Sequence, residues 1–106
     1  MMENVERRVR RSVEPRQALC IFLDAARERL GVHTLTVSNS DGSLVAGAGE
    51  DALLVAALGA KVDSGEQSSE QVATWRLSVG PKIFLITSLG ARLTSDLGEG
   101  VRRILS

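Results

Sequence analysis

The side chains of this sequence that could do chemistry are few and far apart. His33 is the only histidine and Cys20 the only cysteine among the 106 residues. A zinc site with the usual set of His and Cys ligands cannot be assembled from them within one chain. A Cys-His dyad would require Cys20, inside a predicted helix, to reach His33 on the following strand. We therefore expect no catalytic residue, no metal site and no cofactor.

Two further motifs have simpler structural explanations. The run Gly47-Ala48-Gly49 contains glycines that could cradle a phosphate, but the chain has no GxxxxGK[ST] pattern and no lysine opens the next helix. A short connection between a strand and a helix explains these glycines better. The adjacent carboxylates Glu50 and Asp51 are placed where a helix begins, and capping of its free amides accounts for them.

The elements that must position these residues follow from hydrophobic spacing. A helix is predicted between Pro15 and Leu30, and Cys20 within it is expected to be buried. A hairpin follows, with strands from Val32 to Ser38 and from Ser43 to Ala48 around a polar turn. The apolar stripe of the helix recurs at steps of three and four and comprises Leu19, Phe22, Leu23, Ala26 and Leu30.

A second helix is predicted from Ala52 to Val62, and nearly all of its residues are apolar. At 100° per residue, one side is bulky and the opposite side is smooth. The bulky side carries Leu54, Val55, Leu58 and Val62, and the smooth side carries Ala52, Ala56, Gly59 and Ala60.

The second half of the chain repeats the hairpin-then-helix order. Residues 63–70 are polar and are expected to form a loop, although a degraded edge strand there stays possible. A strand from Gln71 to Val79 and a central strand from Lys82 to Ser88 form another hairpin. A last helix spans residues 91–105. The fold class is α/β, an antiparallel four- or five-stranded sheet flanked by three helices in the order α-β-β-α-(β)-β-β-α.

Composition limits the partners. Basic and acidic residues are 13 each, so no general attraction to nucleic acid or anionic lipid is expected, and no run is long enough to enter a membrane. A lone cysteine and the lack of an apolar export segment near the start favour the cytoplasm. Residues 1–14 are expected to be a basic arm, and residues 15–106 the folded domain. Four arginines of the arm are expected to dock on an acidic partner surface: Arg7, Arg8, Arg10 and Arg11.

The second helix carries more apolar surface than a monomer of this size needs, because one side of it would otherwise face water. A second copy of the chain is the simplest cover, and the alternative is shielding by the first or last helix. Small residues allow two helices to approach closely across a two-fold axis. The predicted dimer interface therefore comprises Ala52, Leu53, Ala56, Gly59 and Ala60.

The hairpin and the helix after it resemble the roadblock/dynein light chain family. The matching features are Ser-x-x-Asp-Gly-x-x-Val-Ala from Ser38 to Ala46, the acidic pair Glu50-Asp51, and Leu-Leu-x-Ala-Ala-Leu at residues 53–58. The resemblance covers residues 16–105. It implies a roadblock/longin (profilin-like) architecture, a homodimer around the second helix and a shared sheet edge, and no catalytic residues. The polar stretch 63–70 departs from the family's extra strand and places that shared edge in doubt.

Two functions from different classes follow. The resemblance implies a non-catalytic homodimeric adaptor or regulator that binds a small Ras-like GTPase or scaffolds a protein complex. The alternative is a profilin-like or PAS/GAF-like sensor that holds a small molecule between sheet and helices. A sensor needs converging polar groups in a cavity, and the polar strand residues available for this are Thr34, Thr36, Ser78 and Thr87.

Overall fold

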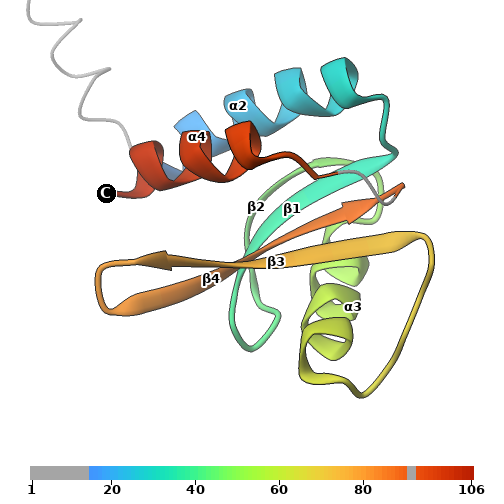
Figure 1. The fold of residues 1–106 in the computed structure, drawn as a ribbon. Helices are drawn as coiled ribbons and strands as arrows, with labels where there is room; N and C mark the ends of the chain where they lie inside the picture. Colours follow the sequence, from blue (N-terminus) through green and yellow to red (C-terminus); the bar gives the residue numbers. More distant parts are fainter. Residues whose placement is uncertain (1–14, 91–92) are drawn as a thin grey trace, which may run out of the picture.

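The computed structural model describes residues 15–90 and 93–106, which form three helices and a four-stranded sheet (Figure 1). The order α-β-β-α-β-β-α confirms the predicted fold class in its four-stranded form. The elements are α2 (Pro15–Leu30), β1 (Thr34–Asn39), β2 (Leu44–Gly49), α3 (Ala52–Ser64), β3 (Val72–Val79), β4 (Lys82–Leu89) and α4 (Ser95–Leu105).

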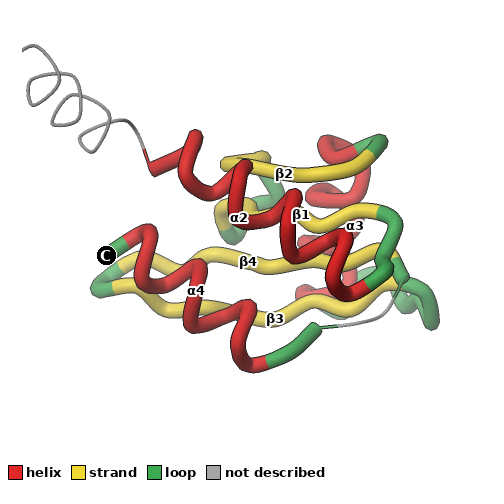
Figure 2. The backbone as a smooth tube through the Cα atoms, turned by 90° about the horizontal axis from the view of Figure 1, so that it is seen from above, coloured by secondary structure: helices red, strands yellow, loops and turns green. Residues whose placement is uncertain are grey.

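The four strands pair antiparallel in the order β2-β1-β4-β3, so β2 and β3 are the edges. Figure 2 shows these two strands on opposite sides of the sheet. β4 lies inside the sheet, and residues 84–88 are buried as predicted for a central strand, whereas Lys82 and Ile83 are exposed. Val37 pairs with Ala46 on one side and with Ile86 on the other, and this register points all three side chains to the same face.

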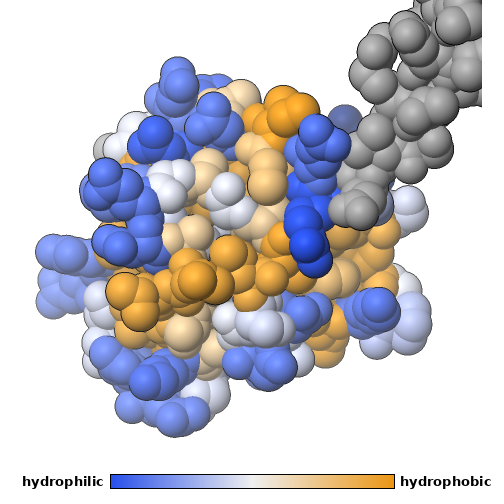
Figure 3. All heavy atoms as spheres, turned by 180° about the vertical axis from the view of Figure 1, so that it is seen from behind, coloured by the Kyte–Doolittle hydropathy of each residue, from blue (hydrophilic) through white to orange (hydrophobic). Residues whose placement is uncertain are grey.

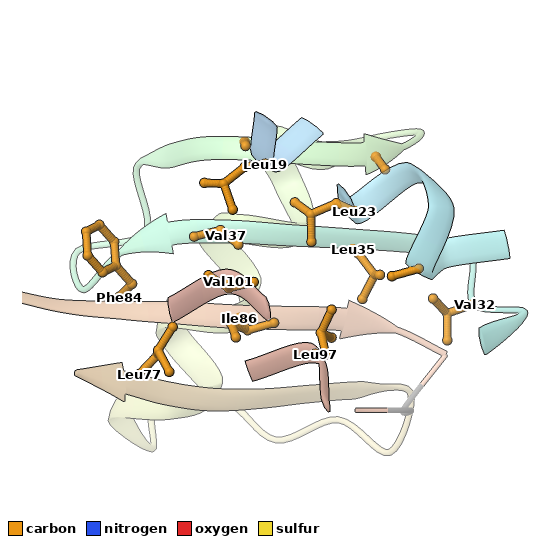
Figure 4. Close-up of a cluster of buried hydrophobic side chains, with 13 residues drawn as sticks. Leu19, Leu23, Val32, Leu35, Val37, Leu77, Phe84, Ile86, Leu97 and Val101 are labelled. Atoms are coloured by element: carbon orange, nitrogen blue, oxygen red, sulfur yellow. The ribbon is translucent and has the colours of Figure 1, made fainter. Parts of the chain in front are cut away.

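Helices α2 and α4 lie side by side on one face of the sheet and enclose the main hydrophobic core (Figures 2 and 4). The predicted stripe of α2 is confirmed, because Leu19, Leu23 and Ala26 are buried, with Phe22 and Leu30 packed against them. Helix α4 contributes Leu97 and Val101. The core is completed by one residue of the α2–β1 connection and by strand residues, namely Val32, Leu35, Val37, Ala46, Ala48, Leu77, Phe84 and Ile86.

Helix α4 approaches α2 closely because it carries glycine where a side chain would collide. A Cβ atom added at Gly100 would lie 2.3 Å from the Phe22 ring. Gly98, by contrast, has room, since its nearest neighbours are Trp75 ring atoms at 3.9 Å. The two glycines that weaken the helix pattern therefore have different roles, and only Gly100 is required by packing.

The opposite face of the sheet is covered by α3 alone, which contacts all four strands. Residues 63–70 form no strand, and α3 instead continues to Ser64. Arg76 of β3 donates from Nε to both carboxylate oxygens of Asp63 at 3.1 Å and ties the end of the helix to this edge. The polar sequence that departs from the roadblock pattern thus corresponds to the end of a helix and a loop. None of the described helices is long and apolar enough to cross a membrane.

Candidate protein interaction surface

The side of α3 that faces the sheet is lined mainly with small residues, and Val55 is a larger side chain buried with them. Ala56 and Gly59 are buried, and a Cβ atom added at Gly59 would lie 2.0 Å from Oγ1 of Thr87 on β4. Ala60 approaches Gly42, and Ala52 approaches Gly47, with 3.0 and 2.9 Å between the alanine Cβ and the site of an added glycine Cβ. The helix therefore packs directly onto the strands, and its smooth side is covered by its own chain.

This packing corrects the predicted dimer interface. Ala56 has no exposed surface, and both it and Gly59 contact the sheet of their own chain, so neither can contact a second copy. Ala52 and Ala60 are half-buried against the turn and strand below. Leu53 is the predicted interface residue that points outward. The expected alternative, cover by the first or last helix, is also wrong, because the sheet covers this side.

The outer face of α3, defined by Leu53, Leu54, Ala57 and Lys61, is exposed. Leu53 and Leu54 are 71% and 70% exposed, the highest values among the described large apolar residues. They lie next to each other in the first turn of α3, which follows β2 after two residues. Isolated surface leucines are common. Two adjacent leucines on a helix whose other side is packed form an apolar patch, and such patches are typical of protein interaction sites.

A second apolar feature lies beside the edge strand β2. Ile21 of α2 is 68% exposed, and with Cys20 and Asp24 it lines a groove of about 430 Å³ along Gly47, Ala48 and Gly49. Figure 3 shows apolar atoms gathered in a band across the molecular face opposite to that of Figure 1. We call this groove and the free side of the strand the β2 edge.

The two reactive side chains are not brought together. Cys20 is exposed and lines the β2 edge, so the prediction that it is buried is wrong. It lies one residue beyond Leu19, which turns it about 100° away from the buried stripe. His33 lies in another groove, of about 490 Å³, with Glu70 and Gln71 among its neighbours, and its Nδ1 is 2.9 Å from Oγ1 of Thr34.

The acidic pair before α3 does not cap the helix as expected. Asp51 is the N-cap residue, but its backbone is left-handed at φ 59° and its side chain makes no capping hydrogen bond. Both carboxylates are exposed at the end of β2. In the β1–β2 turn, the backbone and side chain of Ser43 donate to Asp41, which lowers the pKa of that carboxyl below its usual value. Carboxylates therefore border both ends of β2.

None of the polar strand residues considered for a ligand site lines either of the two grooves described above. Thr34, Thr36 and Thr87 are fully buried, whereas Ser78 is exposed. The Thr87 hydroxyl lies 2.6 Å from that of Thr74, directly below Gly59. Within residues 15–90 and 93–106, no group of three His, Cys, Asp or Glu side chains is arranged to hold a metal. The four arginines of the basic arm lie outside the described residues.

Comparisons with known proteins find similarity at the level of the fold. No family model matches the sequence, and no curated protein matches it. Among solved structures, MglB of Myxococcus xanthus is similar, with 14% sequence identity over 82% of this chain and 84% of that chain and a TM-score of 0.49.

Sequence reasoning missed the outward direction of Leu54 and the whole β2 edge. The helix is apolar nearly all round, so its pattern does not show which side the sheet covers. A usable signal was present in the strands, where Thr36 and Thr87 put short side chains below the helix. Short strand residues are matched by small helix residues, because a close-packed interior leaves no gap between layers.

Proposed function

We propose that this protein is a non-catalytic cytoplasmic adaptor that forms a homodimer and binds a small Ras-like GTPase or scaffolds a protein complex. The observation that carries the proposal is the outer face of α3, where Leu53 and Leu54 are about seven-tenths exposed. The hairpin motifs that resemble the roadblock family and the observed order of elements support the same role. The basic arm, residues 1–14, is proposed as an additional docking element.

In the proposed dimer, a two-fold axis places the outer faces of two α3 helices against each other. Full burial of a leucine side chain contributes about 1.5–3 kcal/mol, and four leucines meet across the axis. Association itself costs about 4–15 kcal/mol, so the net affinity is modest. We therefore expect a dimer that dissociates at low concentration, and a single charge at this face should be enough to prevent it.

The test is sedimentation of the wild-type protein and of a Leu54→Arg variant over about a hundredfold range of protein concentration. The wild type is expected to shift from monomer to dimer, and Leu54→Arg to remain monomeric with unchanged thermal stability. Ile83→Arg on β4 is the matched control, because Ile83 is also exposed but lies on a strand. A wild type that is monomeric throughout, or a Leu54→Arg variant that dimerises normally, removes α3 from the interface.

Ala56→Arg and Gly59→Glu are unsuitable for this purpose, although they follow directly from the predicted interface. Both residues are buried against the sheet of their own chain. Either charge would unfold the domain whether or not a dimer exists, so loss of dimer would carry no information.

Binding to a GTPase is tested by capture from a lysate of the source cells with the immobilised full-length protein. The lysate is loaded with either GDP or a non-hydrolysable GTP analogue, and retained proteins are identified by mass spectrometry. A Ras-like GTPase retained preferentially with one nucleotide is expected, and deletion of residues 1–13 should weaken retention at low salt. Retention of no GTPase with either nucleotide contradicts this part of the proposal.

A further inference from the structure

The edge strand β2 has hydrogen-bonding groups to offer along its free side. Its single strand neighbour among the described residues is β1, so alternate backbone N–H and C=O groups point outward. The strand Leu44–Gly49 contains no charged side chain and no proline, two of the usual means of blocking an edge. The register irregularity opposite Val37 and Ser38 is confined to its first residues, and Ala46–Gly49 continue in regular pairing.

A groove runs beside this strand and would receive the side chains of an added strand. Cys20, Ile21 and Asp24 of α2 form one wall, and Gly47, Ala48 and Gly49 form the floor, enclosing about 430 Å³. Ile21 is 68% exposed and supplies an apolar contact. Only glycine and alanine form the floor, so no large side chain covers the backbone of β2 there. The geometry suits an extended segment with small or apolar residues at alternate positions.

The charges around the β2 edge decide what kind of segment fits. Asp24 lies in the groove, Asp41 precedes the strand, and Glu50 and Asp51 follow it. Arg27 also reaches this end, where it lies next to Gly49, but its guanidinium is engaged with the carbonyl of His33 at 3.4 Å and its Nε is buried. Among the described residues named here, the carboxylates of Asp24, Asp41, Glu50 and Asp51 therefore outnumber the one cation, Arg27.

A second copy of the chain does not match this charge pattern. Antiparallel pairing of two β2 strands brings the residues before one strand next to the residues after the other. Asp41 of one copy would then approach Glu50 and Asp51 of its partner, and like charges placed opposite each other are destabilising. A basic segment would instead place its cations among these carboxylates.

We propose that the β2 edge binds an extended, basic segment of a partner protein, which adds to the sheet as a fifth strand. Backbone hydrogen bonds to β2 hold the segment, apolar side chains contact Ile21, and flanking Lys or Arg residues pair with Asp24, Glu50 and Asp51. The inference rests on the proposed role in protein binding and specifies its partner. It is independent of self-association, which concerns the outer face of α3.

The test measures binding of a fluorescent octapeptide of alternating valine and arginine to the full-length protein. A second peptide of the same charge has proline at two alternate valine positions, which removes two backbone donors. We expect saturable binding of the first peptide and loss of at least about tenfold affinity for the second. Hydrogen exchange should slow at residues 44–49 when the first peptide is bound and should not slow with the second.

Charge variants of the protein test the acidic border. The double variant Asp24→Lys, Glu50→Lys should bind the alternating peptide about tenfold more weakly, and the difference should shrink with added salt. The matched control is Glu66→Lys, Glu99→Lys, which changes the net charge equally at exposed positions in the α3–β3 loop and on α4. This control should bind nearly as the wild type does.

Four other outcomes would contradict the proposal. Equal binding of the proline peptide, or equal weakening by both charge pairs, would mean nonspecific attraction rather than strand addition. Slow exchange at residues 44–49 that depends on protein concentration without peptide would assign the edge to a second copy. Tighter peptide binding after deletion of residues 1–13 would assign it to the chain's own arm. Sedimentation of Leu54→Arg reports on the dimer separately, so failure here leaves that proposal standing.

Discussion

The two faces of the sheet are packed by different means. The face below α2 and α4 is filled by large aliphatic side chains, among them Leu23, Leu35 and Ile86, in a continuous core. The face below α3 presents short side chains such as Thr36 and Thr87 around the larger Leu85, and α3 meets them mainly with alanine and glycine. The first face gains stability mainly from apolar burial, and the second depends on close approach of backbones and on hydroxyl hydrogen bonds.

The difference explains why α3 is apolar on both sides. A helix that covers a leucine-rich face uses its large residues inward, as α2 does with Leu19 and Leu23. Helix α3 instead turns Val55, Ala56 and Gly59 toward the sheet, and Leu53 and Leu54 remain outside. The apolar outer face is therefore not used in the packing of the chain's own sheet, and it is available for contact with another protein.

The largest expected effect comes from the face of large side chains. Leu35→Ala removes a fully buried side chain between β1 and the two helices and should lower the free energy of unfolding by about 2–5 kcal/mol. Urea unfolding followed by circular dichroism measures it. Leu53→Ala on the outer face of α3 is the control and should change the unfolding free energy of the monomer by less than about 0.5 kcal/mol. Equal losses at both positions would mean that Leu53 is buried in solution.

Much of this arrangement was predictable from spacing, and the parts that were not share one cause. The stripe of α2, the two hairpins and the buried strand β4 follow from local periodicity, which reports which residues share a face. Periodicity does not report the distance between layers. The inward direction of Ala56 and Gly59 depends on the threonines of β1 and β4, which are remote in sequence.

A smaller effect is expected from a single methyl group at the close contact. Gly59→Ala places a Cβ atom 2.0 Å from Oγ1 of Thr87, so α3 must shift, and we expect a loss of about 1–3 kcal/mol. Thr87→Ala removes the two nearest atoms, so the double variant should lose less than the sum of the single variants. Urea unfolding of the four proteins gives the coupling free energy.

Gly98→Ala provides a control of opposite sign for this steric argument. It lies in α4 with its nearest neighbours at 3.9 Å, so an added methyl group fits, and alanine should stabilise the helix by about 0.5–1 kcal/mol. If Gly59→Ala also stabilised the protein, α3 would not be as close to β4 as the structure places it. The two faces of the sheet would then be packed at similar distances.

A comparably small effect separates two buried threonines on the α3 side of the sheet. Thr36 is fully buried and its hydroxyl has no hydrogen-bond partner among the described residues, whereas the Thr87 hydroxyl lies 2.6 Å from that of Thr74. Valine has nearly the same shape as threonine and lacks the hydroxyl. Thr36→Val should therefore stabilise the protein by about 1 kcal/mol, because an unpaired buried hydroxyl is removed.

Thr87→Val should instead destabilise the protein by about 1 kcal/mol, because it breaks the hydroxyl pair and leaves Thr74 only the carbonyl of Ile86 at 3.4 Å. The opposite signs are the informative result, since both substitutions make the same chemical change on the same face. Thermal unfolding of the two variants alongside the wild type measures the difference. Destabilisation by Thr36→Val would mean that its hydroxyl is hydrogen-bonded in solution, and the α3 side would then depend on hydroxyl pairing throughout rather than at β4 alone.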